Sequence, residues 1–305
     1  MSRLSKAMLA VGAFSLALAM SSLAGATGNS QSRREGKRVD TRIVFSNNHL
    51  CDGNDCGGGE IAVVNLNGRS FKRLTHNFLT DESPAWSPKK KRIAFTRMPA
   101  NGSTRFGLWV MDANGRHQRR LPGPVFVKAP DWSPNGRSIV FEGGDSQKYP
   151  GLAELWTVNV RTGHLTRQFW SKSSCDAPAW SPDGTRIAFG SNRIGGEQIW
   201  VLNLRDHQLR QLTRGPTQSY TPIWSPDGRR IAVWRSGYIW VIKADGTHAR
   251  RVGGPADEFT WSADGKWIVF SERSLYAIHP DGTGRHTIRH EAGGSNGWVD
   301  TGPDG

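Results

Sequence analysis

The sequence is poor in cysteine, in recognisable catalytic or metal-binding strings, and in long apolar runs. Its 305 residues include three cysteines, which allow one disulfide and one spare thiol and exclude a small disulfide-rich scaffold. It has no His-Glu-x-x-His string, no glycine-rich phosphate loop and no Cys-x-x-Cys pair, and its nine histidines have no zinc-type spacing. Beyond residue 26 no apolar run approaches the length of a membrane span. We therefore expect no metal, no cofactor and no membrane-spanning domain.

The first 26 residues predict an export signal. Arg3 and Lys6 give a positively charged start, residues 7–23 form an uncharged apolar run, and residues 24–26 (AGA) have the small-x-small form of a cleavage site. A retained membrane anchor is the alternative, although the apolar run is short for a full bilayer span. We expect the mature chain to begin near Thr27 and to be exported, either to the periplasm or as a secreted protein associated with the cell envelope.

Acidic residues are scarce relative to basic ones. The sequence holds 26 Asp and Glu against 40 Lys and Arg, a net charge of +14, and residues 27–305 carry +12 because the first 26 residues include two basic and no acidic residues. This excess favours anionic partners. Residues 27–41 have no apolar period and predict a disordered lead-in. We expect one domain over residues 42–305.

Three short phrases recur in order through this domain. The first is a β-branched and aromatic run, which ends at Phe45, Phe95, Phe141, Phe189, Val233 and Phe270. The second, EIAVVN in its first copy, has equivalent positions at Ala62, Trp109, Trp156, Trp200, Trp240 and Tyr276. The third is a basic, half-apolar run such as FKRLT or LRQLT. Each run is short and bounded by Gly, Pro, Asn or Asp, which is typical of strands.

A fourth phrase of the form W-S-P-D-G precedes five of the six sets, with its tryptophan at Trp86, Trp132, Trp180, Trp224 and Trp261. Its proline and glycine suit a tight turn between two strands. The four runs together predict a four-stranded antiparallel blade, with strands A to D, and such units at intervals of 36 to 47 residues predict a β-propeller. The expected fold class is all-β: a six-bladed propeller whose tryptophans pack between blades.

The first of the six sets lacks an A strand, and the C-terminal stretch GWVDTGPDG supplies a candidate. Trp298 stands in this stretch where the repeat tryptophan stands in the five complete units. We expect residues 297–305 to pair with the first blade and close the ring, since closure removes the exposed strand edges. A frayed terminus with an accidental tryptophan is the alternative.

The quoted phrases, chiefly AWSPDG followed by RIAF, QIWVLN and LRQLT, resemble the WD40-like repeats of TolB-like six-bladed β-propellers. The resemblance covers residues 42–305. It implies an exported, non-catalytic scaffold that mediates protein or cell-envelope interactions. Similar repeats occur in the propeller domains of prolyl-oligopeptidase-type peptidases. TolB carries an α/β domain ahead of its propeller, whereas this sequence has only the lead-in at residues 27–41, so the resemblance implies a stand-alone propeller.

Two strings that suggest chemistry lack the context that the chemistry needs. GGSNG at residues 293–297 fits G-x-S-x-G. A nucleophile elbow needs a strand before it, a helix after it, and Asp and His partners further along the chain, and only eight residues follow Gly297, so we expect no catalytic residue. CDGNDCGGGE offers oxygen ligands, yet Cys56 breaks the calcium-loop spacing. Cys51 and Cys56 are instead the candidate disulfide pair. The alternative function is a metal-dependent lactonase or lyase whose ligands come from separate blades around the channel.

Propeller topology assigns the charges to two faces. The A–B and C–D turns share one face, and these turns carry an excess of basic residues, among them Lys89, Lys90, Lys91, Arg92, Arg119, Arg120, Arg250 and Arg251. A cell-wall polymer or lipid surface is the partner expected here. Nucleic acid is not expected, because these turns lack the interleaved aromatic residues that stack on bases.

The opposite face is acidic. Six carboxylates lie near the repeat tryptophan at the entry to strand A, namely Asp81, Glu82, Asp131, Asp176, Asp257 and Glu258. Because strand A is expected to be innermost, we hypothesise that they ring a channel mouth that binds a basic peptide or a cation. The alternative is that they cap turns. Long B–C loops in the first three blades share this face, so we expect another envelope or secreted protein to bind here. We expect the chain itself to be a monomer.

Overall fold

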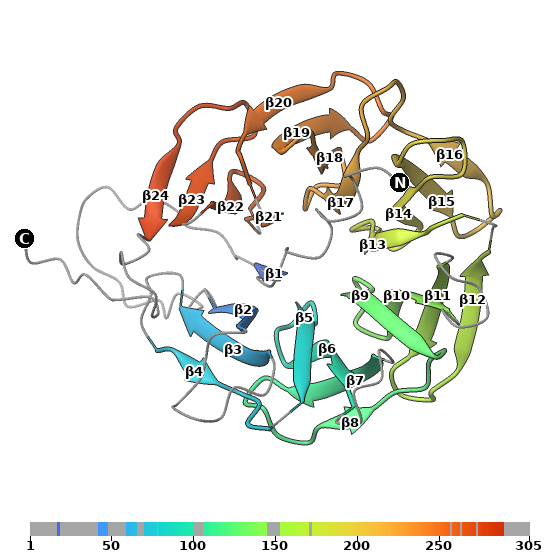
Figure 1. Ribbon diagram of the computed structural model, residues 1–305, viewed down its shortest axis with the longest axis vertical. Coiled ribbons are helices and arrows are strands. Elements are labelled where there is room, and N and C mark those ends of the chain that lie inside the picture. Colours follow the sequence, from blue (N-terminus) through green and yellow to red (C-terminus); the bar gives the residue numbers. More distant parts are fainter. Residues whose placement is uncertain are drawn as a thin grey trace, which may run out of the picture.

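The computed structural model describes residues 17–18, 42–47, 59–65, 70–77, 79–99, 106–144, 153–170, 173–256, 258–262, 264–272 and 274–289. They form six antiparallel sheets of four strands, which are arranged around a common centre (Figure 1). No helix in these segments has the length and apolar character that a membrane crossing requires. The all-β prediction is confirmed for these segments.

Five sheets are blades in which four consecutive strands pair in order. Their strands are β5 (Thr80–Trp86), β6 (Arg92–Met98), β7 (Gly107–Asp112) and β8 (Arg119–Arg120); β9 (Phe126–Trp132), β10 (Ser138–Gly144), β11 (Glu154–Asn159) and β12 (Leu165–Phe169); β13 (Asp176–Trp180), β14 (Arg186–Ser191), β15 (Gln198–Asn203) and β16 (Leu209–Gln211); β17 (Tyr220–Trp224), β18 (Arg230–Arg235), β19 (Tyr238–Lys243) and β20 (Arg250–Gly253); β21 (Glu258–Trp261), β22 (Ile268–Glu272), β23 (Ser274–Ile278) and β24 (His286–Arg289). They correspond to the second to sixth predicted blades, and these numbers are kept below.

The first sheet differs from the prediction. It contains β2 (Arg42–Asn47), β3 (Glu60–Asn65) and β4 (Lys72–Arg73), but its innermost strand is the two-residue β1 (Ala17–Leu18), which pairs with Val44 and Ile43 of β2. The structure therefore shows five blades made of repeat strands, not six. The predicted closing strand around Trp298 lies outside the described residues. Closure of the ring by that strand stays a prediction.

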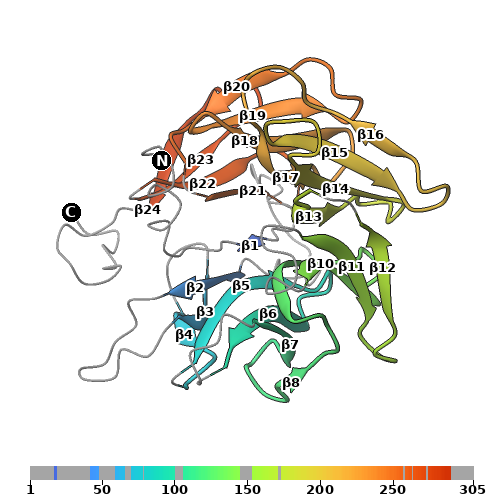
Figure 2. The ribbon, with the colours of Figure 1, turned by 45° about the vertical axis from the view of Figure 1, so that its right-hand side comes forward.

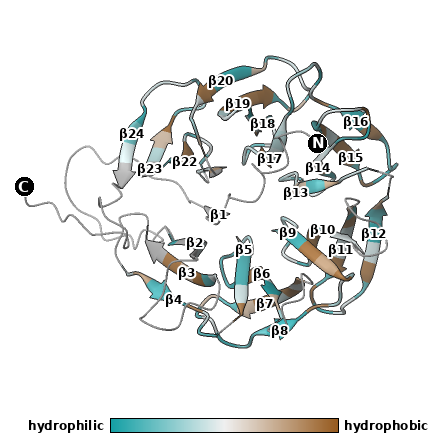
Figure 3. Ribbon diagram, viewed as in Figure 1, coloured by the Kyte–Doolittle hydropathy of each residue, from teal (hydrophilic) through white to brown (hydrophobic). Residues whose placement is uncertain are grey.

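The A strands face the centre and the D strands form the outer rim. Figures 1 and 2 show β5, β9, β13, β17 and β21 innermost in their blades, and Figure 3 shows apolar residues concentrated on middle strands such as β15 and β19, while outer strands such as β8 and β16 are polar. This distribution follows from the architecture, because both faces of a middle strand are covered by neighbouring blades.

The W-S-P-D-G phrase forms the A–B turn through side-chain hydrogen bonds. In the fourth blade the Ser181 hydroxyl donates to Asp183 at 2.6 Å and accepts the backbone N–H of Arg186 at 2.9 Å. The fifth blade repeats both bonds with Ser225 and Asp227. Serine and aspartate suit these positions because they satisfy backbone and side-chain donors where the ladder ends, and Asn135 takes the place of the aspartate in the third blade.

The same turn contacts its neighbour. A Cβ built on the turn glycine of one blade would lie 3.7 Å from the proline ring of the preceding turn, at Gly184 against Pro134 and at Gly228 against Pro182. Below these turns Trp86, Trp132, Trp224 and Trp261 are buried and Trp180 is half-buried. The indole N–H of Trp132 donates to the carbonyl oxygen of Ala85 in the preceding blade at 3.1 Å. Successive turns thus stack around the ring.

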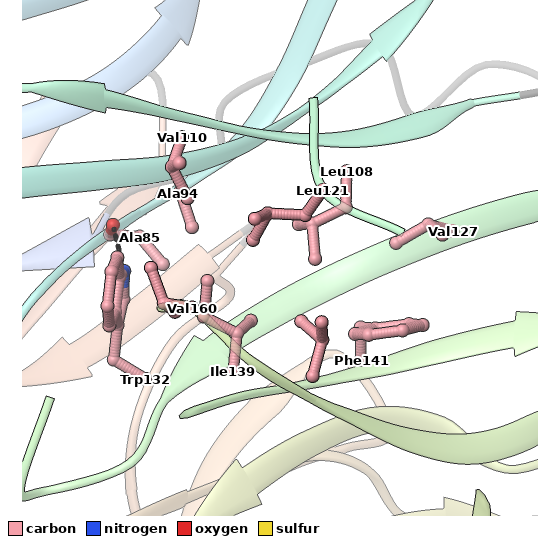
Figure 4. Packing of buried hydrophobic residues seen from close by; sticks show 11 residues of the cluster. Ala85, Ala94, Leu108, Val110, Leu121, Val127, Trp132, Ile139, Phe141 and Val160 are labelled. Carbon is pink, nitrogen blue, oxygen red and sulfur yellow. Dashed lines mark hydrogen bonds between the residues drawn. The ribbon is translucent and has the colours of Figure 1, made fainter. Parts of the chain in front are cut away.

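The core lies between adjacent sheets, as predicted for the tryptophans. Between the second and third blades, Trp132, Ile139 and Phe141 pack against Ala85 and Leu108 (Figure 4). Equivalent clusters fill the other described interfaces. Arginines at the start of strand B add stacking across blades, with Arg186 4.6 Å from the Trp224 ring centroid and Arg230 5.0 Å from that of Trp261.

Substitution of Gly246 tests how tightly successive blades approach. Gly246 has φ of +83° in a C–D turn, and a Cβ there would lie 2.7 Å from the carbonyl oxygen of Leu212 in the preceding blade. Gly237 has φ of +84° with nothing within 4 Å. Both Gly→Ala variants should lose about 1–2 kcal/mol of unfolding free energy through backbone strain, and Gly246→Ala should lose a further ~1–3 kcal/mol through the clash. Chemical denaturation measures the difference, and equal losses would contradict the close approach.

Candidate functional site

Each of four A strands carries a bulge before its proline. The bulged residue has a positive φ of 45° to 50°, at Ser83, Ala129, Ala177 and Thr221. The register of the A–B ladder shifts at the same places. The following proline cannot donate to the ladder, which explains why the irregularity recurs. At each bulge the regular alternation of side chains between the two faces of the strand is interrupted. In the fourth blade the residue just before the bulge is Asp176.

Asp176 belongs to a cluster of three carboxyl groups at the junction of the third and fourth blades. Glu142, on β10, accepts a hydrogen bond from the backbone N–H of Ala177 and feels the charge of Asp176. Glu197 comes directly before β15, and its Oε1 would lie 2.8 Å from a Cβ on Gly190, a position that is 3.7 Å from the Cβ of Asp176. The cluster therefore joins two blades at the bulge of strand A.

Burial and mutual repulsion favour the protonated forms of Glu142 and Glu197. Burial raises the pKa of Glu142 to about 8, and the charge of Asp176 adds to this effect, while Lys128 opposes it. Burial, followed by the charge of Asp176 and a side-chain hydrogen bond with it, also raises the pKa of Glu197, which is 7% exposed. A cationic group placed here would release these protons and pair with the carboxylates.

The same two blades carry two exposed apolar side chains. Trp170 is 52% exposed and Ile194 is 59% exposed. Arg193 stacks 4.8 Å from the ring centroid of Phe169, which brings the Trp170 and Ile194 segments together. The hydroxyl of Ser174 donates to Glu197 at 3.2 Å. Exposed apolar side chains of this size are common at protein-binding surfaces.

Two of the predicted mouth carboxylates serve the fold. Asp81 is fully buried and accepts from Arg97 at 2.6 and 2.8 Å, so its charge is already paired. Asp131 accepts the backbone N–H of Trp180 in the next blade at 2.7 Å, and burial raises its pKa to about 6. Both carboxylates therefore have hydrogen-bond partners within the fold, and a binding role for them stays a prediction.

The other predicted residues have different outcomes. Glu82 is half-buried and burial raises its pKa. Asp257 and the side chain of Glu258 lie outside the described residues, as do Cys51 and Cys56, so the ring of six and the disulfide stay predictions. Cys175 is buried in the core between the third and fourth blades.

Glu142 and Glu197 are not among the predicted site residues. The predicted carboxylates lie in the connections that enter strand A, whereas Glu142 lies near the end of strand B and Glu197 at the entry to strand C. One signal was present: Glu142 extends the apolar run SIVF, and a carboxylate that continues a buried strand needs a specific environment.

The predicted basic residues are mostly exposed on the outside of their blades. Lys89, Lys91, Arg92, Arg119, Arg120, Arg250 and Arg251 are exposed. Lys90 is the exception, because it is buried and its Nζ donates to the carbonyl oxygen of Arg42 at 3.3 Å. It holds the first two sheets together and is not available to a polymer.

A metal centre finds no support among the described segments, where no three His, Cys, Asp or Glu side chains converge closely enough to hold an ion.

The fold is a β-propeller built from four-stranded antiparallel blades. Residues 90–283 match the family described as the TolB beta propeller domain, and the chain therefore belongs to this family.

Relatives agree with this assignment. The chain is 32% identical over 158 residues to the Protein TolB homolog of Chlorobium luteolum, a match that covers 52% of this chain and 34% of the relative. It is 37% identical over 78 residues to the Tol-Pal system protein TolB of Rhizorhabdus wittichii, covering 26% of this chain and 17% of the relative. The chain thus matches about a third or less of the length of these two relatives.

Solved structures of a TolB protein and of an enzyme have a similar fold. TolB from Acinetobacter baumannii matches with a TM-score of 0.65 and 21% identity, covering 81% of this chain and 63% of that one. An oligogalacturonate lyase in complex with manganese matches with a TM-score of 0.58 and 16% identity, covering 81% and 73%. The fold alone does not separate the two classes of function.

Replacement of Glu142 by Gln tests the buried carboxyl cluster. The pKa of Glu142 is about 8 when folded against an ordinary 4.5, so unfolding releases a proton between these values and wild-type stability falls as pH rises from about 4.5 to 8. Each pKa unit corresponds to about 1.4 kcal/mol. Glu142→Gln should therefore match wild type at pH 4 and be more stable by a few kcal/mol at pH 8.

Glu154→Gln is the control, because Glu154 lies outside the cluster and pairs with exposed Arg167 at 3.3 Å. Denaturation across pH measures both variants. A stability difference for Glu142→Gln that does not change with pH would contradict the buried, protonated state.

Replacement of Asp81 by Ala separates a structural role from a binding role. It leaves Arg97 buried without its counter-charge, so we expect a loss of about 3–5 kcal/mol in unfolding free energy. Glu154→Ala removes a pair whose arginine is exposed, together with the acceptor of the Trp156 indole N–H, and should lose less, about 1–2 kcal/mol. Calorimetry measures both, and an Asp81→Ala variant of wild-type stability would show that the ion pair does not support the fold.

Proposed function

We propose that this chain is an exported, non-catalytic propeller that binds another protein of the cell envelope through the surface around Glu142, Asp176 and Glu197. The observation that carries the proposal is the cluster of three carboxyl groups, for which the described residues supply one nearby cation, Lys128. The same two blades carry the exposed side chains of Trp170 and Ile194. Such a surface fits a partner segment that offers a lysine or arginine next to an apolar residue. Membership of the TolB propeller family and the Tol-Pal name of one relative support an envelope system as its context.

The proposal includes a mature form that begins near Thr27, in the periplasm or at the cell surface. Ala17–Leu18 occupy the edge of β2, which is the edge that the predicted closing strand at residues 297–305 needs. Removal of residues 1–26 leaves this edge free, and pairing with the C-terminal strand then completes a sixth blade. Closure satisfies the backbone groups of β2 that cleavage exposes.

Capture of envelope proteins by the mature chain, residues 27–305, tests the binding surface. Wild type should retain a defined protein through high-salt washes, because salt screens a buried ion pair much less than an exposed one. A Glu142→Gln/Glu197→Gln double variant should lose most of this capture. Asp206→Asn is the matched control, since Asp206 is an exposed carboxylate in a C–D turn on the opposite face.

Capture that is equal for all three proteins would contradict the assigned surface. Turnover of an oligogalacturonate or a lactone that depends on added Mn²⁺ and is abolished by chelation would instead establish the enzyme alternative. Mass spectrometry of the bound fraction and an absorbance assay of turnover provide the two measurements.

A further inference from the structure

Four D strands carry a basic residue at one register position. In each it stands opposite the valine of the neighbouring C strand, in the pairs Lys72 with Val63, Arg119 with Val110, Arg210 with Val201 and Arg250 with Val241. The equivalent register means that these four side chains leave their blades in the same direction, toward the next blade around the ring.

Three of the four connect to a backbone carbonyl of the next blade. Arg119 donates to the carbonyl oxygen of Val160 at 2.5 Å, and Arg210 donates to that of Asp245 at 2.7 Å. Lys72 reaches a carbonyl oxygen of the second blade at 3.5 Å. At these three interfaces the basic side chain therefore links two neighbouring blades.

Arg250 is the exception. Its guanidinium makes no hydrogen bond and has no carboxylate within 4.0 Å in the part of the chain that the structure describes. In place of the bond, an open pocket of about 390 Å³ lies between the fifth and sixth blades, where β20 and the turn before β24 are neighbours on the outer rim (Figure 1). Arg251, Asp281, Thr283 and Arg285 line it together with Arg250.

Aromatic rings hold two of these guanidinium groups. Arg285 lies 4.4 Å from the ring centroid of Tyr276 and pairs with Glu272 at 3.1 Å. Arg251 lies 4.6 Å from the ring centroid of Tyr238. Stacking on an aromatic face leaves the in-plane N–H groups of a guanidinium available to an acceptor and reduces the entropy lost on binding.

One carboxylate also lines the pocket. Oδ1 of Asp281 accepts both the backbone N–H of Thr283 at 2.9 Å and its hydroxyl at 2.6 Å, so part of its hydrogen-bonding capacity is taken by the turn. Glu272 pairs with Arg285 and the charge of Arg250 acts on Asp281, so Arg251 leaves the surroundings with a positive charge in excess. The fifth blade contributes Arg250 and Arg251 and the sixth blade contributes Arg285, so an anion in the pocket would have donors from two blades.

We propose that this pocket binds a phosphate group, either free or in a lipid headgroup. A guanidinium offers a planar fork of N–H donors that matches two phosphate oxygens, and a tetrahedral anion can face two such forks at once. The volume leaves room for the alcohol of a phosphate ester. The site goes beyond the protein-binding surface proposed above, because it lies between different blades and selects a ligand of opposite charge.

Titration calorimetry of residues 27–305 with inorganic phosphate and with glycerol 3-phosphate tests the site. Wild type should bind with an affinity that falls as salt rises. Arg250→Gln and Arg285→Gln should each weaken binding about tenfold or more, because each removes a charged hydrogen-bonding group. Arg210→Gln is the matched control, since Arg210 has the same register but donates to a carbonyl oxygen; its affinity should equal that of wild type. Arg250→Lys should retain part of the binding.

Vesicles distinguish the two sources of phosphate. Co-sedimentation with phosphatidylglycerol vesicles but not with phosphatidylcholine vesicles, lost in Arg250→Gln and competed by glycerol 3-phosphate, supports a lipid headgroup. Phosphate binding that depends on Arg250 without vesicle binding supports a free ligand. No binding of either soluble phosphate at millimolar concentration, or equal losses in Arg250→Gln and Arg210→Gln, overturns the proposal, because the second result describes a diffuse basic surface.

Discussion

Contact between neighbouring blades at the repeat tryptophan is the constraint on which the structure depends. A four-stranded blade cannot cover its own two faces, so each must be buried by a neighbour. The tryptophan at the end of strand A fills this interface, and its indole N–H reaches the preceding blade where Trp132 meets Ala85 and where Trp261 meets Ile223. The stacked A–B turns hold the same spacing above it.

This constraint also determines where polar groups can be buried. Strand A must run along the centre, and its bulge before proline releases backbone donors that carboxylates from adjacent strands accept, as Glu142 does from Ala177. At most interfaces such groups are paired within the fold, as Asp81 is with Arg97. The junction of the third and fourth blades departs from this rule, because three carboxyl groups meet there with one nearby lysine. Buried groups that the fold leaves poorly paired are the ones available to a partner.

The basic residues follow the same logic. The sequence treats them as one positive face, but many are structural: Arg186 and Arg230 stack on tryptophans, Lys90 joins two sheets, and Arg119 binds a carbonyl oxygen of the next blade. The net charge therefore overstates the surface that is free to bind an anion. Arg250 differs from the other three D-strand residues, because among the described residues it makes no inter-blade hydrogen bond and instead lines a pocket.

The sequence by itself determined the strands, their order within a blade, the A–B turns and the inter-blade role of the tryptophans. These features depend on local periodicity and on turn-forming residues, and both recur in every repeat. The sequence predicted six blades, whereas only five are made of repeat strands in the structure, since pairing at the edge of β2 is non-local and Ala17–Leu18 take that edge. The tertiary structure alone decided which charges are free. Glu142 and Glu197 are 55 residues apart in sequence and meet only when two blades pack, and burial there, not residue type, sets their protonation.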